Sequence, residues 1–100
     1  MKTILRYDIN EAINKIDLPI GYKILSVGIA EDEKGRESIS MWCEVDTIED
    51  SYETEDTDDA LILVFGTGAN MDCLTNFDYK FIGTVQKSNK YAFHVIQAFN

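Results

Sequence analysis

The sequence predicts a mainly β fold, a small antiparallel β-sandwich or open barrel of six or seven strands with little helix. Two observations support this prediction. Several segments alternate apolar and polar residues with the period of two that is typical of half-buried strands, and short clusters of turn residues separate them. The chain also lacks the alternation of strands with long helical segments that a parallel sheet would need.

The length and composition indicate one domain over residues 1–100. A chain of 100 residues, of which 45% are apolar, can bury one core without disulfides or metal ions. No apolar run approaches the roughly 20 residues of a membrane-spanning helix. Residues 1–8 become polar too early for a signal peptide. We therefore expect a cytoplasmic protein with no membrane partner.

The first part of the chain predicts two extended segments. Residues 2–9 alternate as a half-buried strand does. Residues 10–17 carry isoleucines at helical spacing, but a helix here would have barely two turns. We therefore favour a short extended segment over residues 16–18.

A turn and a third strand are expected next. Pro19 and Gly21 predict a turn over residues 18–21, in which Gly21 is free to adopt a positive φ. Residues 22–30 then alternate as a strand. This alternation places one set of side chains on a common face: Lys23, Leu25, Val27 and Ile29.

The strand expected over residues 39–46 directs one apolar set to the core: Ile39, Met41, Cys43 and Val45. Trp42 therefore lies on the opposite, polar face. An exposed tryptophan can contact a ligand or be covered by a second subunit, and both readings stay open. They are compatible, because ligand pockets often form where subunits meet.

The negative charge is concentrated in one segment. The seven acids of residues 49–59 account for most of the net charge of −9, so the rest of the chain is nearly neutral. A block of like charges with few apolar residues does not pack. We expect residues 47–59 to form a mobile acidic loop. The charge disfavours nucleic acid polymers as partners.

The continuous apolar run over residues 61–65 predicts a central strand buried on both faces, and the segment Gly66-Thr67-Gly68 follows it. Two interpretations of this segment stay open. It is either a tight turn or a nest whose backbone N–H groups bind an anion such as phosphate. It has neither the Walker spacing nor the dinucleotide-binding spacing.

The C-terminal part predicts a connection and a hairpin. Residues 69–78 form a polar connection with room for one helical turn, and its expected buried anchors are Met71, Cys73, Leu74 and Phe77. Residues 79–86 and 91–99 are the two strands of the hairpin, joined by residues 87–90.

Catalysis is not expected. His94 is the single histidine, it lies in a predicted strand, and no nucleophile motif accompanies it. Cys43 and Cys73 are expected to be buried reduced thiols. A structural zinc site needs about four ligands, so neither a metal nor another cofactor is expected. Several polar and aromatic groups are better suited to stacking or hydrogen bonding with a ligand: Arg6, Tyr7, Trp42, Tyr91 and His94.

Six segments carry a family resemblance in sequence order: residues 1–4, Leu18-Pro19-x-Gly21-x-Lys23-Ile24-Leu25-Ser26-Val27, Trp42-x-x-Val45-Asp46, Phe65-Gly66-Thr67-Gly68, Ile82-Gly83-Thr84-Val85-Gln86 and His94-Val95. Together they resemble a family of small proteins common in tailed-phage genomes. That family looks similar to the phage sponge proteins of the anti-CBASS type, which sequester the cyclic-nucleotide signals of bacterial immunity. The segments 47–59 and 96–100 look longer than the family pattern.

The resemblance implies a function without turnover. A homo-oligomer, dimer or tetramer, would enclose a cyclic oligonucleotide between subunits in the cytoplasm of the infected bacterium. The glycine turn and basic groups would bind phosphates, and aromatic rings would stack on bases. The residues expected to contact the ligand are Arg6, Tyr7, Trp42, Phe65, Gly66, Thr67, Gly68, Tyr91 and His94.

A second hypothesis belongs to another class. The acidic segment 49–59 could bind a host protein directly, as an inhibitor or as a mimic of DNA charge. The two hypotheses make different segments essential, the glycine turn in one and the acidic segment in the other.

Overall fold

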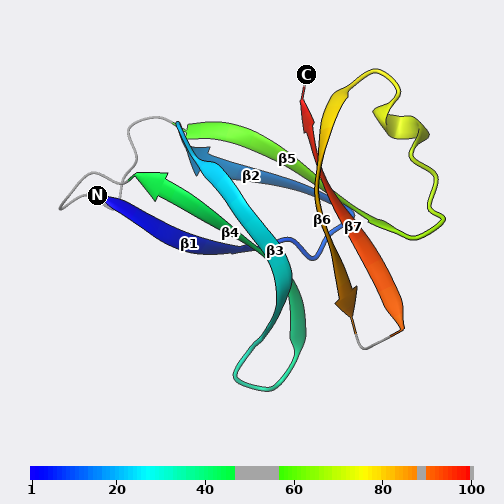
Figure 1. The fold of residues 1–100 in the computed structure, drawn as a ribbon, viewed down its shortest axis with the longest axis horizontal. Coiled ribbons are helices and arrows are strands. Elements are labelled where there is room, and N and C mark those ends of the chain that lie inside the picture. Colours follow the sequence, from blue (N-terminus) through cyan, green and yellow to red (C-terminus); the bar gives the residue numbers. More distant parts are fainter. Residues whose placement is uncertain (47–56, 88–89, 100) are drawn as a thin grey trace.

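The computed structural model describes residues 1–46, 57–87 and 90–99, and these contain seven strands and one short 3-10 helix, η1. The strands form two antiparallel sheets, one of three strands in the order β1-β4-β3 and one of four in the order β2-β5-β7-β6 (Figure 1). This confirms the predicted small mainly β fold. The elements are β1 (Lys2–Asp8), β2 (Ile13–Pro19), β3 (Lys23–Glu31), β4 (Glu37–Asp46), β5 (Thr57–Gly66), η1 (Asp72–Leu74), β6 (Asp78–Lys87) and β7 (Tyr91–Phe99).

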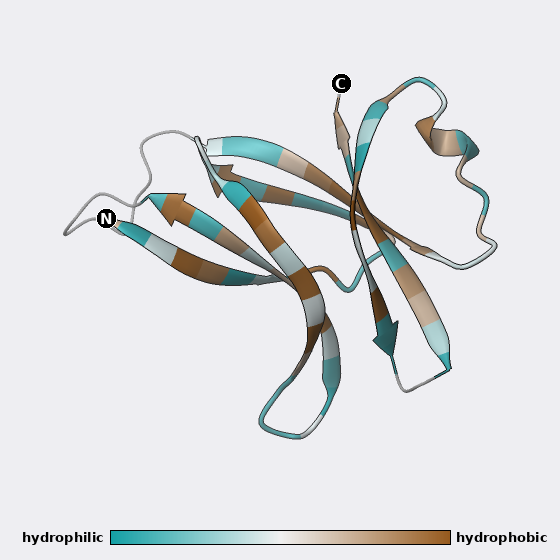
Figure 2. Ribbon diagram, viewed as in Figure 1, coloured by the Kyte–Doolittle hydropathy of each residue, from teal (hydrophilic) through white to brown (hydrophobic). Residues whose placement is uncertain are grey.

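The main core lies between the two sheets. Apolar and polar residues alternate along the strands (Figure 2), so each strand can direct one apolar set inward. The apolar set of β4 is buried as predicted, and it packs with inward-facing residues of the other sheet. Buried members of this cluster include Leu18, Met41, Cys43, Val45, Ile62 and Val95.

A smaller apolar cluster covers the outer face of the four-stranded sheet. It combines Leu63 of β5 and Ile96 of β7 with Leu74 of η1, and Phe77 packs against it. Strand β5 lies inside its sheet, between β2 and β7, and buries side chains on both faces. This confirms the prediction of a central strand buried on both sides.

Several element boundaries differ from the prediction, and the largest difference in the first part of the chain is that the short extended segment expected over residues 16–18 is the seven-residue strand β2. The turn after β2 occupies residues 19–22, because the N–H of Tyr22 donates to the carbonyl of Pro19 over 3.1 Å. Gly21 has the expected positive φ of 86° in this turn. The predicted loop 47–59 is wrong for its last three residues, since 57–59 belong to β5 and pair with β2. Residues 47–56 lie outside the described part of the chain.

The strict alternation predicted for β3 is wrong. The pairing of β3 with β4 shifts by one residue between Ile24 and Ser26, which is a β-bulge. The bulge leaves Leu25 45% exposed, while Ile24 and Val27 both pack against the main core. A bulge inserts one extra residue into a strand. Ile24 and Val27, which lie on either side of the bulge, can therefore face the same side of the sheet.

Strands β3 and β6 approach each other closely at the margin of the two sheets. The closest point is Gly83 of β6, where a Cβ atom would lie only 2.8 Å from Cγ2 of Val27 in β3. Strand β6 also has a register shift between Phe81 and Gly83. The missing side chain of Gly83 therefore permits this approach. None of the described helical segments is long and apolar enough to cross a membrane.

The two cysteines differ in their surroundings. Cys43 is buried in the main core, and this burial raises the pKa of its thiol to about 11. Cys73 in η1 is exposed and Met71 is 37% exposed, so the predicted burial of both side chains is wrong. Of the expected anchors of this connection, Leu74 is buried and Phe77 half-buried.

We expect the two thiols to react at very different rates. Native protein at pH 8 should lose one thiol quickly to a thiol reagent such as DTNB, because Cys73 is exposed, while Cys43 is both buried and protonated. The second thiol should react only after unfolding in guanidinium. Rapid labelling of both thiols in the native protein would contradict the described core.

The substitution Gly83→Ala should lower the free energy of unfolding by about 1–3 kcal/mol, because the added methyl group would overlap the stiff side chain of Val27. The matched control is Gly66→Ala, where a Cβ atom would meet no atom within 4 Å. Urea denaturation of both variants measures the difference. Equal stability of the two variants would show that β3 and β6 are not in close contact.

Candidate functional site

The glycine segment forms a turn that leaves little of its backbone free. The N–H of Ala69 donates to the carbonyl of Gly66 over 3.0 Å, and Gly68 has a φ of 87°. The N–H of Thr67 donates to the carbonyl of Ala92 in β7 over 3.3 Å. These two bonds engage the N–H groups of Thr67 and Ala69 and not those of Gly66 and Gly68, so the anion nest expected from the two glycines stays a prediction. The turn also presents the hydroxyl group of Thr67.

His94 lies between two threonine hydroxyls on the outer face of the four-stranded sheet. Oγ1 of Thr67 is 2.8 Å from Nε2, and Oγ1 of Thr84 is 3.0 Å from Nδ1. Strand pairing produces this arrangement, because His94 is opposite Thr84 in β6 and opposite Phe65 in β5. The imidazole is half-buried and both threonines are exposed.

The protonation state of His94 determines how the threonine hydroxyls are used. A neutral imidazole has one N–H donor and one nitrogen acceptor. One threonine oxygen then accepts from the ring, and its own O–H is left to donate outward. The other threonine donates to the ring and keeps lone pairs for an outside donor. In the imidazolium form both ring nitrogens donate, and both hydroxyls can donate outward.

Exposed aromatic rings continue this surface along β6. The rings of Phe81 and His94 have centroids 6.4 Å apart and are tilted by 41°. Phe81 is 56% exposed and Tyr79, two residues earlier on the strand, is 54% exposed. We call the group formed by Thr67, Tyr79, Phe81, Thr84 and His94 the His94 surface.

Sequence reasoning missed Thr84 and Phe81 as members of the site. A signal was present in the hairpin, whose register decides which residue lies opposite His94. The predicted four-residue connection 87–90 would place Gly83 there, whereas the observed pairing of Lys87 with Tyr91 places Thr84 there. A predicted connection of three residues, 88–90, would therefore have placed Thr84 opposite His94.

Arg6 and Trp42 are brought together, but on the other sheet. They are directly opposite each other in the pairing of β1 with β4. The ring of Trp42 lies against Gly28 of β3, where a Cβ atom would be 3.3 Å from the indole. Arg6 is 3.7 Å from Asp8, whose carboxylate accepts a hydrogen bond from Ser40 over 3.0 Å. The half-burial of Trp42 on this polar face is thus explained by packing on a glycine.

Tyr7 and Tyr91 lie apart from the other predicted site residues. Tyr7 is half-buried and packs against the main core, and this burial, together with the nearby Cys43, raises the pKa of its hydroxyl. Tyr91 is 65% exposed at the start of β7, where alternation places it on the face opposite to His94. Of the predicted set, the structure joins Phe65, Gly66, Thr67 and Gly68 to His94.

The arrangement is suited to hydrogen bonding and stacking. Within the described residues, no group of three His, Cys, Asp or Glu side chains is placed to hold a metal ion. A threonine hydroxyl within reach of an imidazole is also the beginning of a nucleophile–base pair. The third group is the neutral hydroxyl of Thr84, however, and not the carboxylate that stabilises an imidazolium in a hydrolytic triad.

Comparison with known proteins places the chain in a family. Residues 1–99 match the family described as a domain of unknown function, DUF7352. No curated protein and no solved structure matches the chain significantly. Because the match spans almost all of the 100 residues, the protein belongs to the DUF7352 family.

Proposed function

We propose that the protein is a phage-encoded binding protein that captures a cyclic oligonucleotide signal of bacterial immunity without turning it over. Two arguments support this proposal. The sequence segments resemble a tailed-phage family similar to anti-CBASS sponges. The His94 surface offers groups that suit a nucleotide, and three of the segments that carry the resemblance supply Thr67, Thr84 and His94.

The observation that carries the proposal is an exposed aromatic ring beside fixed hydrogen-bonding groups. Phe81 is 56% exposed, and stacking of a nucleobase on an aromatic side chain contributes about 1–3 kcal/mol per base. Next to it, His94 holds the hydroxyls of Thr67 and Thr84 in place. Pre-ordered donors and acceptors can read the edge of a stacked base at a reduced entropic cost.

Phosphate binding is the part of the proposal that requires a second copy. Within one chain, Arg6 and Trp42 lie on the three-stranded sheet, away from the His94 surface on the four-stranded sheet. They can reach the same ligand only from a neighbouring subunit. We therefore propose a homo-oligomer, dimer or tetramer, in which the ligand lies between these two surfaces.

A second candidate function rests on the acidic segment. Its described end, Asp58 and Asp59, is exposed, and Asp59 is paired across the strands with Asp17. Asp17 and Asp59 share a hydrogen bond, which raises the pKa of Asp17 and lowers that of Asp59. These carboxylates form the beginning of a negative surface that could engage a basic host protein.

The sponge proposal predicts large thermal shifts with cyclic di- and trinucleotides. A ligand at about 100 times its dissociation constant adds about 2.7 kcal/mol to the free energy of unfolding. Phe81→Ala should abolish most of the shift by removing the stacking ring, and Thr67→Val should weaken binding by removing one hydroxyl. Differential scanning fluorimetry measures the thermal shift of each variant, and calorimetry measures its affinity for the nucleotide.

Two controls separate the hypotheses. Tyr91→Ala removes an aromatic ring that is more exposed than Phe81 and lies on the other face of the hairpin, and it should leave the nucleotide shift unchanged. Deletion of residues 50–56 removes no residue of β5. It should also leave the thermal shift caused by the nucleotide unchanged. Unchanged melting curves across the nucleotide panel would refute the sponge. Loss of host-protein inhibition in the deletion variant would support the second candidate.

A further inference from the structure

Strand β1 forms an open edge of the three-stranded sheet (Figure 1). Among the described residues it pairs with β4 alone, and its register with β4 is unbroken. Proteins commonly protect an edge strand with a proline, a bulge or a covering element, because its free backbone groups can pair with another strand. The other three edges have such protection. β2 ends in Pro19, while β3 and β6 lie close together and each contains a register shift.

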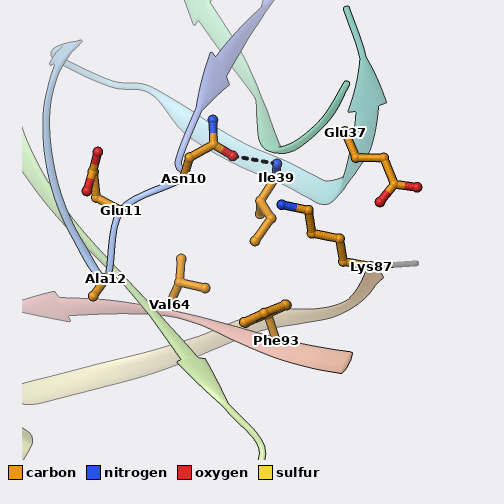
Figure 3. A pocket seen from close by; sticks show the side chains of 8 residues that line it. All are labelled: Asn10, Glu11, Ala12, Glu37, Ile39, Val64, Lys87 and Phe93. Carbon is orange, nitrogen blue, oxygen red and sulfur yellow. Dashed lines mark hydrogen bonds between the residues drawn. The ribbon is translucent and has the colours of Figure 1, made fainter. Parts of the chain in front are cut away.

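The hydrogen bonds at the end of β1 show which of its backbone groups face the free side. The N–H of Ile9 donates to the carbonyl of Ile39 over 2.8 Å, and Oδ1 of Asn10 accepts the N–H of Ile39 over 2.9 Å (Figure 3). Bonded and non-bonded pairs alternate along an antiparallel ladder, so the odd-numbered residues of β1 bond to β4. The backbone groups of the even-numbered residues point away from β4: Lys2, Ile4, Arg6 and Asp8.

Apolar side chains accompany this free backbone on both faces of β1. Leu5 lies opposite the buried Cys43 and therefore faces the same side as the main core, yet it is 41% exposed. Ile4 faces the outer side and is 58% exposed. An edge strand with free backbone groups and exposed apolar side chains is suited to pairing with a further strand.

We propose that β1 pairs antiparallel with β1 of a second copy of this chain, so that the two three-stranded sheets become one continuous sheet. The two-fold axis passes through Leu5, which lies opposite Leu5 of the second copy. This is a non-hydrogen-bonded pair, the type in which facing side chains are closest. Lys2 then lies opposite Asp8 of the second copy, and symmetry produces this pair twice.

Strand length and charge both select this register. Leu5 is the middle residue of β1, so all seven residues of the strand are paired. The free backbone groups require even-numbered residues to face even-numbered residues. One step in one direction places Lys2 opposite Arg6, and one step in the other places Arg6 opposite Arg6. Like charges directly opposite each other destabilise a sheet, whereas opposite charges stabilise it.

This inference names one contact of the homo-oligomer proposed above, but it rests on β1 alone and requires no nucleotide. Thermal shifts with nucleotides test the proposed function separately. A protein that binds nucleotide without this contact is therefore distinguishable from one that forms this contact and binds no nucleotide.

Sedimentation velocity of the full-length protein without ligand tests the proposal. The mass should be about twice the chain mass of 11.4 kDa, or a multiple of that. Ile4→Pro removes an N–H that faces the free side and should halve the mass, while circular dichroism keeps the strand signal. Ile13→Pro makes the same change on the edge strand β2, where Ile13 is 64% exposed, and is the matched control. A monomer at the highest soluble concentration, or an unchanged mass in Ile4→Pro, would overturn the proposal.

Charge exchange tests the register. Lys2→Glu and Asp8→Lys each create two like-charge contacts, so each should raise the dimer dissociation constant about tenfold, which corresponds to about 1.4 kcal/mol. An equimolar mixture of the two variants should regain the dimer, because their heterodimer has opposite charges at both places. Lys80→Glu makes the same change at an exposed position of β6 and should have no effect. A mixture that stays monomeric, or equal weakening by Lys80→Glu, would overturn this register.

Discussion

The burial of β5 on both faces is the constraint on which the rest of the structure depends. Its inward residues Ala60 and Ile62 join the core between the sheets, while Leu63 belongs to the cluster on the outer face. Burial of a side chain as large as Ile62 or Leu63 contributes about 1.5–3 kcal/mol. The connection after β5 must therefore fold back so that Leu74 can cover Leu63. That return path holds Thr67 next to His94.

The two faces of the four-stranded sheet have different chemistry because different elements cover them and neither face is covered completely. On its outer face, the cover provided by η1 and Phe77 protects only part of the sheet, and Phe81 and Tyr79 stay exposed beside it. On its inner face, the three-stranded sheet covers the middle, and a cavity lined by Val64, Lys87 and Phe93 opens where the cover is incomplete (Figure 3). Incomplete cover of a sheet leaves apolar surface that a ligand can use.

The sequence was a good guide to the strands and a poor guide to which side chains meet. Alternation located β1, β4 and the terminal hairpin, because half-burial requires a period of two. It failed for β3, where a bulge changes the face of Leu25 without leaving a mark in the pattern. Thr67 and His94 were both expected to contact a ligand, but their mutual contact depends on pairing between β5 and β7. The separation of Arg6 from His94 depends on sheet order, which local periodicity does not encode.

The β6–β7 hairpin is the common wall of the His94 surface and of the cavity between the sheets. Thr84 and His94 face one side of it, while Lys87 and Phe93 border the cavity on the other. A ligand that orders this hairpin on one side reduces the conformational entropy that a ligand on the other side must still remove. Any such coupling is reciprocal, so each ligand would change the affinity of the other by the same factor.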